Sequence, residues 1–308
     1  MADCAFGEIG ESIRMLKGVI FSVSASLLFG CVYYLAVLLQ PISGEGLLGL
    51  RTLFTIPFLI FVLFLLKQQK VFVDFLKQLK NQPHLILVVL ATSFNMGVQM
   101  WLFLWAPNNG KAIEVSIGYL LMPLIMVLIG RFLYRERLSA IKICAILFAT
   151  VGVASKMILT GVFSWESALV CLGYPVYFSL RKSFKILHLS SFVLEMLLLI
   201  PISVYFALQV DMDFVLQHNP NAYVWLFVLG VVSGVAFTLY ILCSQLIPIN
   251  LLGLLGYLEP FLMLVVSFMI GEVLEENSYI LMGCLTIAIL LLVLDGVVVM
   301  RAKKRQNY

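Results

Sequence analysis

The sequence predicts an all-α integral membrane protein whose ten transmembrane helices form two inverted repeats of five helices each. Three observations support this fold class. Hydrophobic residues make up 62% of the 308 residues and charged residues only 12%, whereas about a quarter of the residues in a soluble domain are charged. The apolar residues fall in long runs, and a membrane-spanning helix needs roughly 20 such residues. Short motifs of the first half also recur in the second half.

The ten apolar runs follow one another with short connections, so little of the chain remains for a domain outside the membrane. The predicted spans are 18–39, 46–66, 84–106, 112–130, 138–158, 165–180, 189–209, 222–246, 250–271 and 279–300. The run that begins at residue 18 is too long for a signal-peptide core and lacks a clear small-residue cleavage site. We therefore expect it to remain as the first span.

The segment between the second and third spans has its own pattern. Apolar residues recur there at helical spacing, opposite three lysines. The apolar positions are Phe72, Phe75, Leu76 and Leu79, and the lysines are Lys70, Lys77 and Lys80. This pattern predicts a short basic amphipathic helix on the inner membrane surface. A second local motif, Gly230-x3-Gly234, predicts close helix packing within the chain.

Three motifs of the first half recur in the same order, at separations between 137 and 144 residues. They are Gly30-x3-Tyr34 with Gly173-x3-Tyr177, Arg51-x5-Pro57 with Glu195-x5-Pro201, and Gly118-Tyr119-Leu120 followed by Pro123 with Gly256-Tyr257-Leu258 followed by Pro260. An odd number of spans in each unit makes the second copy enter the membrane upside down. The predicted repeats are residues 13–158 and 163–303. Inverted repeats are a common architecture of secondary transporters.

The positions of lysine and arginine predict the orientation. Sixteen of the 20 basic residues fall on one side of the ten-span arrangement. They are Arg14, Lys17, Lys67, Lys70, Lys77, Lys80, Arg131, Arg135, Arg137, Arg181, Lys182, Lys185, Arg301, Lys303, Lys304 and Arg305. By the positive-inside rule, both termini are expected in the cytoplasm. The net charge of +4 thus reflects topology, and nucleic acid is not an expected partner.

Cysteine and histidine give no sign of a metal or cofactor. The six cysteines have no paired spacing, and the three histidines lie at span edges or in loops. Small apolar packing residues are the expected role of the cysteines. We expect neither a metal site nor a cofactor.

Four residues are candidate hinges: Gly118 and Pro123 in the fourth span, and Gly256 and Pro260 in the ninth. A proline removes a helix hydrogen bond, and the freed carbonyl in lipid must face protein or a wet cavity. Interrupted helices at matching positions of two repeats are a sequence indicator of a transporter's binding site. An ordinary packing kink is the alternative interpretation.

Glu259 is the strongest candidate for proton coupling. A charged carboxylate at the centre of a membrane helix costs about 2.5–3.5 kcal/mol, so it should face the bundle interior. A carboxyl group that is neutral or charged depending on its access to water would suit a proton carrier. A hydrogen-bonded structural glutamate is the alternative.

Three further charged residues are candidates for coupling or gating. Glu114 opens the fourth span, where a carboxylate is also favoured by the helix dipole. Arg51 and Glu195 lie a turn or two inside opposite faces, so a direct pair between them is not expected. In one interpretation, Arg51 and Glu195 each gate the transport pathway at their own end of the protein. In the other, each side chain only reaches the nearby membrane interface.

Several aromatic residues lie too deep for an interfacial belt, namely Tyr33, Trp101, Tyr119, Tyr177 and Tyr257. A cavity lined by such rings with few charges suits apolar or aromatic organic substrates, or zwitterions. These residues, with Trp105 and Asn108, are the candidate substrate-binding residues. Packing or lipid contact is the alternative for each.

The run Trp105-Ala106-x-Asn108-Asn109-x4-Glu114-x-Ser116-x-Gly118-Tyr119-x3-Pro123 resembles RarD-type permeases of the EamA family, in the drug/metabolite transporter superfamily. Gly30, Arg51, Tyr177-x3-Arg181-Lys182 and Glu195-x5-Pro201 fit the same family, so the resemblance covers nearly the whole chain. It implies a bacterial inner-membrane permease with two five-helix EamA repeats around a central cavity. The Glu-Pro at Glu259 fits a subgroup of the family, which makes any proton role of Glu259 a subgroup property.

The sequence therefore predicts a permease that exports a small organic metabolite, amino acid or drug by alternating access, with or without proton coupling. Uptake or exchange is the alternative within transport. An intramembrane enzyme would need facing catalytic groups, and no aspartate or histidine lies mid-span. The expected partners are the small organic substrate and membrane lipid, and a monomer is the expected state.

Overall fold

The structure is a computed structural model that describes residues 2–133, 135, 138–161, 163–247 and 255–306, and within these ranges it contains helices and no strands. The first half comprises α1 (Ala2–Leu38), α2 (Gly44–Leu65), α3 (Gln69–Asn81), α4 (His84–Trp105), the 3-10 turn η1 (Ala106–Asn108), α5 (Ala112–Leu133) and α6 (Ala140–Thr160). The second half comprises α7 (Trp165–Ser183), α8 (Leu189–Leu198), α9 (Ile200–Leu208), α10 (Met212–His218), α11 (Ala222–Leu246), α13 (Leu258–Met269), the 3-10 turn η2 (Glu276–Ser278) and α14 (Tyr279–Gln306).

Seven of the described helices are long and apolar enough to cross a membrane, or eight if the bent pair α8 and α9 is one span. This confirms an all-helical membrane protein. The predicted sixth span is the helix α7, which carries Glu166, Arg181 and Lys182 and is not among the seven. Of the predicted ninth span, residues 250–254 lie outside the described residues, and α13 has only 12 residues. Ten spans therefore stay a prediction.

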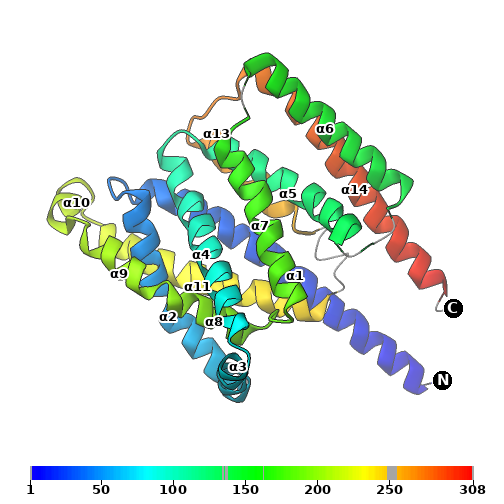
Figure 1. The fold of residues 1–308 in the computed structure, drawn as a ribbon, viewed down its shortest axis with the longest axis horizontal. Coiled ribbons are helices and arrows are strands. Elements are labelled where there is room, and N and C mark those ends of the chain that lie inside the picture. The colour runs from blue at the N-terminus through cyan, green and yellow to red at the C-terminus, as the bar shows by residue number, and fades with distance from the viewer. Residues whose placement is uncertain (1, 134, 136–137, 162, 248–254, 307–308) are drawn as a thin grey trace.

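Helices of the two halves interleave (Figure 1). The first-half helix α1 packs on α11 and α13, and the second-half helix α7 packs on α4 and α5. The helices α6 and α14 run antiparallel and pack mainly on each other at the edge of the bundle. The start of α1 and the end of α14 lie on the same side of the bundle.

Glycines allow the closest of these helix contacts. A Cβ at Gly118 in α5 would lie 2.8 Å from the carbonyl oxygen of Ser167 in α7. Gly230 and Gly234 in α11 face Phe54 and Phe58 of α2 in the same way. The Gly-x3-Gly motif thus packs within the chain, as predicted.

The proline-containing spans differ from each other. The helix α5 runs without a break through Gly118 and Pro123, so the expected interruption is wrong at this position. A proline is tolerated in a membrane helix where neighbouring groups satisfy the freed backbone carbonyl. In the second half, Gly256 and Tyr257 form a turn and α13 begins at Leu258, which places Pro260 in its first turn.

The predicted surface helix is α3, and its apolar face rests on the protein. Phe75 and Leu79 are buried and pack in one cluster with Leu85, Val89 and Ile186. The lysines of α3 are exposed.

Candidate functional site

Arg51 occupies the interior of the bundle. Its side chain is 2% exposed, and its guanidinium carbon lies 5.6 Å from the ring centroids of both Phe103 and Phe237. Its Nε donates to Ser233 Oγ at 2.9 Å, the only hydrogen bond that the described residues give this guanidinium. Aromatic faces stabilise a desolvated cation. Because only Nε of the guanidinium donates to a described residue, the other N–H groups of Arg51 are available to a further partner.

Glu259 provides the opposite charge. It lies in the first turn of α13 and interacts electrostatically with Arg51, Tyr119 and Tyr174. The hydroxyls of Tyr119 and Tyr174 share a hydrogen bond of 2.8 Å. Glu259 and Tyr174 keep partly exposed surfaces although helices of both halves surround them.

We call this group the central cluster; it comprises Arg51, Phe103, Tyr119, Tyr174, Phe237 and Glu259. Tyr33 extends it, because its ring lies 4.9 Å from that of Phe103 and its hydroxyl donates to the Ala112 carbonyl at 3.1 Å. A cation, a carboxylate and several aromatic rings within a membrane protein are the groups that would bind a small organic molecule with both ring and charged parts.

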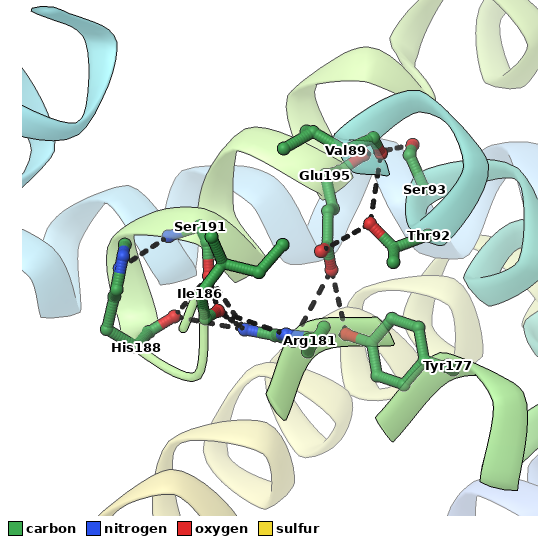
Figure 2. Close-up of polar contacts among 9 residues, drawn as sticks. All are labelled: Val89, Thr92, Ser93, Tyr177, Arg181, Ile186, His188, Ser191 and Glu195. Atoms are coloured by element: carbon green, nitrogen blue, oxygen red, sulfur yellow. Dashed lines mark hydrogen bonds and ion pairs between the residues drawn. The ribbon is translucent and has the colours of Figure 1, made fainter. Parts of the chain in front are cut away.

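A second polar group surrounds Glu195, which is fully buried (Figure 2). Its carboxylate accepts hydrogen bonds from Thr92 Oγ1 at 2.8 Å and from the Tyr177 hydroxyl at 2.7 Å. Arg181 Nη1 lies 3.4 Å from the same carboxylate and also contacts the Tyr177 hydroxyl. Helices α4, α7 and α8 therefore meet at one buried ion pair.

The loop before α8 holds Arg181 in place. Arg181 Nη2 donates to the His188 carbonyl at 3.1 Å and to Ser191 Oγ at 2.8 Å. His188 caps α8, since its Nδ1 accepts the Ser191 N–H at 3.1 Å. Burial, and secondly the charge of Arg181, lower the pKa of His188 below its usual 6.5.

The interfacial interpretation of Arg51 and Glu195 is wrong, because both side chains are buried in protein. As expected, the described residues show no direct pair between Arg51 and Glu195: Glu195 pairs with Arg181, and Arg51 interacts electrostatically with Glu259.

Glu114 belongs to a third group, at the ends of α5 and α6. Lys156 Nζ lies 3.0 Å from the Glu114 carboxylate, 3.7 Å from that of Glu275, and donates to Ser278 Oγ at 2.8 Å. Nearby, the two oxygens of Glu272 accept the N–H groups of Ala112 and Ile113 at 2.8 and 2.7 Å. These contacts join the first half to the loop between α13 and α14.

The remaining candidates lie away from the central cluster. Trp101 and Trp105 pack with Trp165, and Trp101 Nε1 donates to Glu45 at 3.0 Å. Asn108 bonds to Gln40 and to the Ala36 carbonyl. Tyr257 is buried, and its hydroxyl has no hydrogen-bond partner among the described residues. The structure thus brings Arg51, Tyr33, Tyr119 and Glu259 together but not the tryptophans, Asn108 or Tyr257.

Sequence reasoning missed several members of these groups, chiefly Phe103, Tyr174, Phe237, Arg181, Thr92 and Lys156. Arg181 is one of the basic residues that predict the orientation, and Lys156 lies at the end of the predicted span 138–158. Thr92 and the two phenylalanines are common in any membrane helix. Tyr174, inside the Gly173-x3-Tyr177 motif, and Arg181, in the family-like Tyr177-x3-Arg181-Lys182 motif, carried a sequence signal. Among the described residues, no group of three or more His, Cys, Asp or Glu side chains could hold a metal.

Comparison with known proteins decides the family. The model of the EamA-like transporter family matches residues 16–158. Over 94% of this chain and 98% of its own length, the "Chloramphenicol-sensitive protein RarD" of Pseudomonas aeruginosa is 33% identical. The chain belongs to the EamA family of transporters, as a RarD-type member. It is a multi-pass membrane protein of the drug/metabolite transporter superfamily, and the enzyme alternative is therefore wrong.

Two further relatives of this EamA protein are more similar still. An uncharacterised transporter of Pasteurella multocida is 50% identical over 94% of the chain and 99% of its own length. One from Haemophilus influenzae is 49% identical over 92% and 95%. A solved crystal structure with 16% identity has a TM-score of 0.57 over 91% of this chain and 98% of its own, a likeness of fold alone.

Proposed function

We propose that this EamA protein is a secondary transporter that exports a small organic metabolite, amino acid or drug by alternating access. The observation that carries the proposal is the central cluster, in which Arg51 and Tyr119 of the first half interact electrostatically with Glu259 of the second half. A substrate held there would contact both halves, so movement between the halves would change its access to the two sides. Tyr33, Tyr119 and Tyr174 would contact its ring, and Arg51 a carboxylate or another acceptor.

The proposed repeats are residues 13–158 and 163–303, related by inversion. Two contacts at corresponding positions, at opposite ends of the α6 and α14 pair, support this arrangement. Ser139 before α6 bonds to Asp295 in α14, and Ser278 before α14 bonds to Lys156 in α6. The separation in sequence between Ser139 and Ser278 equals that between Lys156 and Asp295, as expected for corresponding positions of two repeats.

The proposed location is the bacterial inner membrane, with both termini in the cytoplasm and the protein acting as a monomer. The start of α1, the helix α3 and the end of α14 share one side of the bundle, and the lysines of α3 are exposed. This side would be the inner side by the positive-inside rule.

Glu259 is the proposed proton carrier. A substrate that binds Arg51 would compete with the electrostatic interaction between Arg51 and Glu259. One proton moving down ~100 mV supplies ~2.3 kcal/mol, enough for ~50-fold accumulation of a neutral substrate.

The test uses purified protein in vesicles with an imposed pH gradient and a panel of amino acids, aromatic metabolites and chloramphenicol. We expect flux of at least one compound that the gradient accelerates. Glu259→Gln should retain substrate exchange and lose the acceleration, while Glu276→Gln, at an exposed acid in η2, should behave as wild type. Absence of flux and binding across the panel would reject transport of these classes; unchanged acceleration in Glu259→Gln would reject its role alone.

A further inference from the structure

One end of the bundle carries a strongly basic surface, which we call the basic platform. It comprises Lys67, Lys70, Lys77 and Lys80 in and before α3, Lys182 in the last turn of α7, and Lys185 just after that helix. All six side chains are exposed. The two segments are adjacent, since Phe75 and Leu79 of α3 pack in one cluster with Phe184 and Ile186. Asp74, which pairs with Lys77 at 3.2 Å, is the only acidic residue of α3.

The outer face of α3 is not purely polar. Val71, Val73 and Leu76 are 45%, 48% and 41% exposed among the lysines. The helix also connects the ends of two membrane-spanning helices, α2 and α4. Exposed apolar side chains interspersed with lysines suit the bilayer interface, where the apolar groups enter lipid and the ammonium groups reach the phosphates.

We propose that the basic platform binds the headgroups of anionic phospholipids and thereby stabilises the Arg181–Glu195 ion pair beneath it. Charge complementarity identifies the occupant, because clusters of four to eight basic residues beside a membrane helix attract anionic lipid. The inference does not depend on the transport function.

The connection to the ion pair runs through two contacts. The ring of Phe75 in α3 packs edge-on against His188, with 4.8 Å between the ring centroids. His188 caps α8 through Ser191, and its carbonyl accepts a hydrogen bond from Arg181. A headgroup that holds α3 against the bundle therefore also holds the loop that positions Arg181.

The experiment compares the full-length protein in nanodiscs of phosphatidylcholine with and without phosphatidylglycerol. Phosphatidylglycerol should raise Tm by about 5 °C and slow hydrogen exchange at the start of α8, and high salt should reduce both effects. Glycerol phosphate in solution should produce neither, because the bilayer concentrates the headgroups at the platform.

Three variants locate the effect. The triple variant Lys70→Gln, Lys77→Gln, Lys80→Gln should lose both effects, whereas Lys303→Gln, Lys304→Gln, Arg305→Gln, with equal loss of charge, should keep them. Phe75→Leu should still bind phosphatidylglycerol but show less protection of α8. Equal responses of the two triple variants, or of wild type in the two lipids, would overturn lipid binding; full protection of α8 in Phe75→Leu would overturn its coupling to the ion pair.

Discussion

Arg51 and Glu195 are both charged and both buried in a membrane protein, but their surroundings differ. Glu195 has an arginine and two hydroxyl donors, so its charge is fully paired. Arg51 has two aromatic faces and one serine, which leaves donors available. A saturated group suits a structural junction, and an unsaturated one suits a ligand site. This contrast is why we place the substrate at Arg51 and not at Glu195.

His188 should make the start of α8 sensitive to acid. Its folded-state pKa lies below the ordinary 6.5, so the neutral ring that accepts the Ser191 N–H stabilises the fold. This contribution is complete above pH 6.5 and is lost as the pH falls through the lower folded-state pKa. Arg181 is the charged group that interacts with the ring. We expect a loss of about 1 kcal/mol on acidification.

The measurement is Tm across about pH 5 to 8. His188→Asn should retain a cap but lose the acid-dependent part of the decline. If both proteins decline equally, the sensitivity belongs to another group.

At this scale the sequence predicted the polar residues better than their partners. Glu259 and Tyr119 are recognisable because a polar group deep in an apolar run must face protein. Arg181, Thr92 and Lys156 could not be found in this way, because their roles depend on how α4, α6 and α7 align in three dimensions.

Among the elements, the apolar runs predicted most helices well, because burial in lipid requires every backbone group to bond within its helix. The breaks were predicted less well. The helix α5 is continuous through Pro123, whereas the chain forms a turn at Gly256. The two segments nevertheless carry a similar Gly-Tyr-Leu…Pro motif. The close contact between Gly118 and α7 stabilises the continuous helix α5. A tertiary contact of this kind cannot be predicted from the sequence.

The contact between α5 and α7 depends on the missing side chain of Gly118. Gly118→Ala should destabilise the protein by about 1–3 kcal/mol, because the new methyl group would meet the backbone of Ser167. Gly283→Ala, in α14, is the matched control: its Cβ would meet nothing within 4 Å, and it should be neutral or stabilising by up to about 1 kcal/mol. Thermal unfolding of both variants in one detergent tests this; equal stability would show that α5 and α7 can separate without loss.

For the whole molecule, charged contacts join the two halves at the end opposite α3. Glu272 binds both N–H groups at the start of α5, and Lys156 links Glu114 to Glu275 and Ser278. Opening at this end would require these bonds to break.

Glu272→Ala should therefore favour opening at this end. A cysteine placed at the buried Ser116 should react on the order of tenfold faster with an impermeant maleimide in this variant, since each charged hydrogen bond contributes about 1.5–3 kcal/mol. The native cysteines are replaced beforehand, and Glu276→Ala serves as control. An unchanged rate in Glu272→Ala would mean that Lys156 and its partners alone keep this end shut.

The α6 and α14 pair has a different consequence for the proposed cycle. The two helices are joined by serine hydrogen bonds at repeat-related positions at each end, and Gly152 of α6 lies directly against Cys284 of α14. If the two repeats exchange their conformations during a transport cycle, a helix pair to which each repeat contributes one helix returns to the same arrangement. The helices α6 and α14 would then keep their relative position throughout the cycle. The difference in free energy between the inward-open and outward-open forms would come from the other helices and from the substrate bound to them.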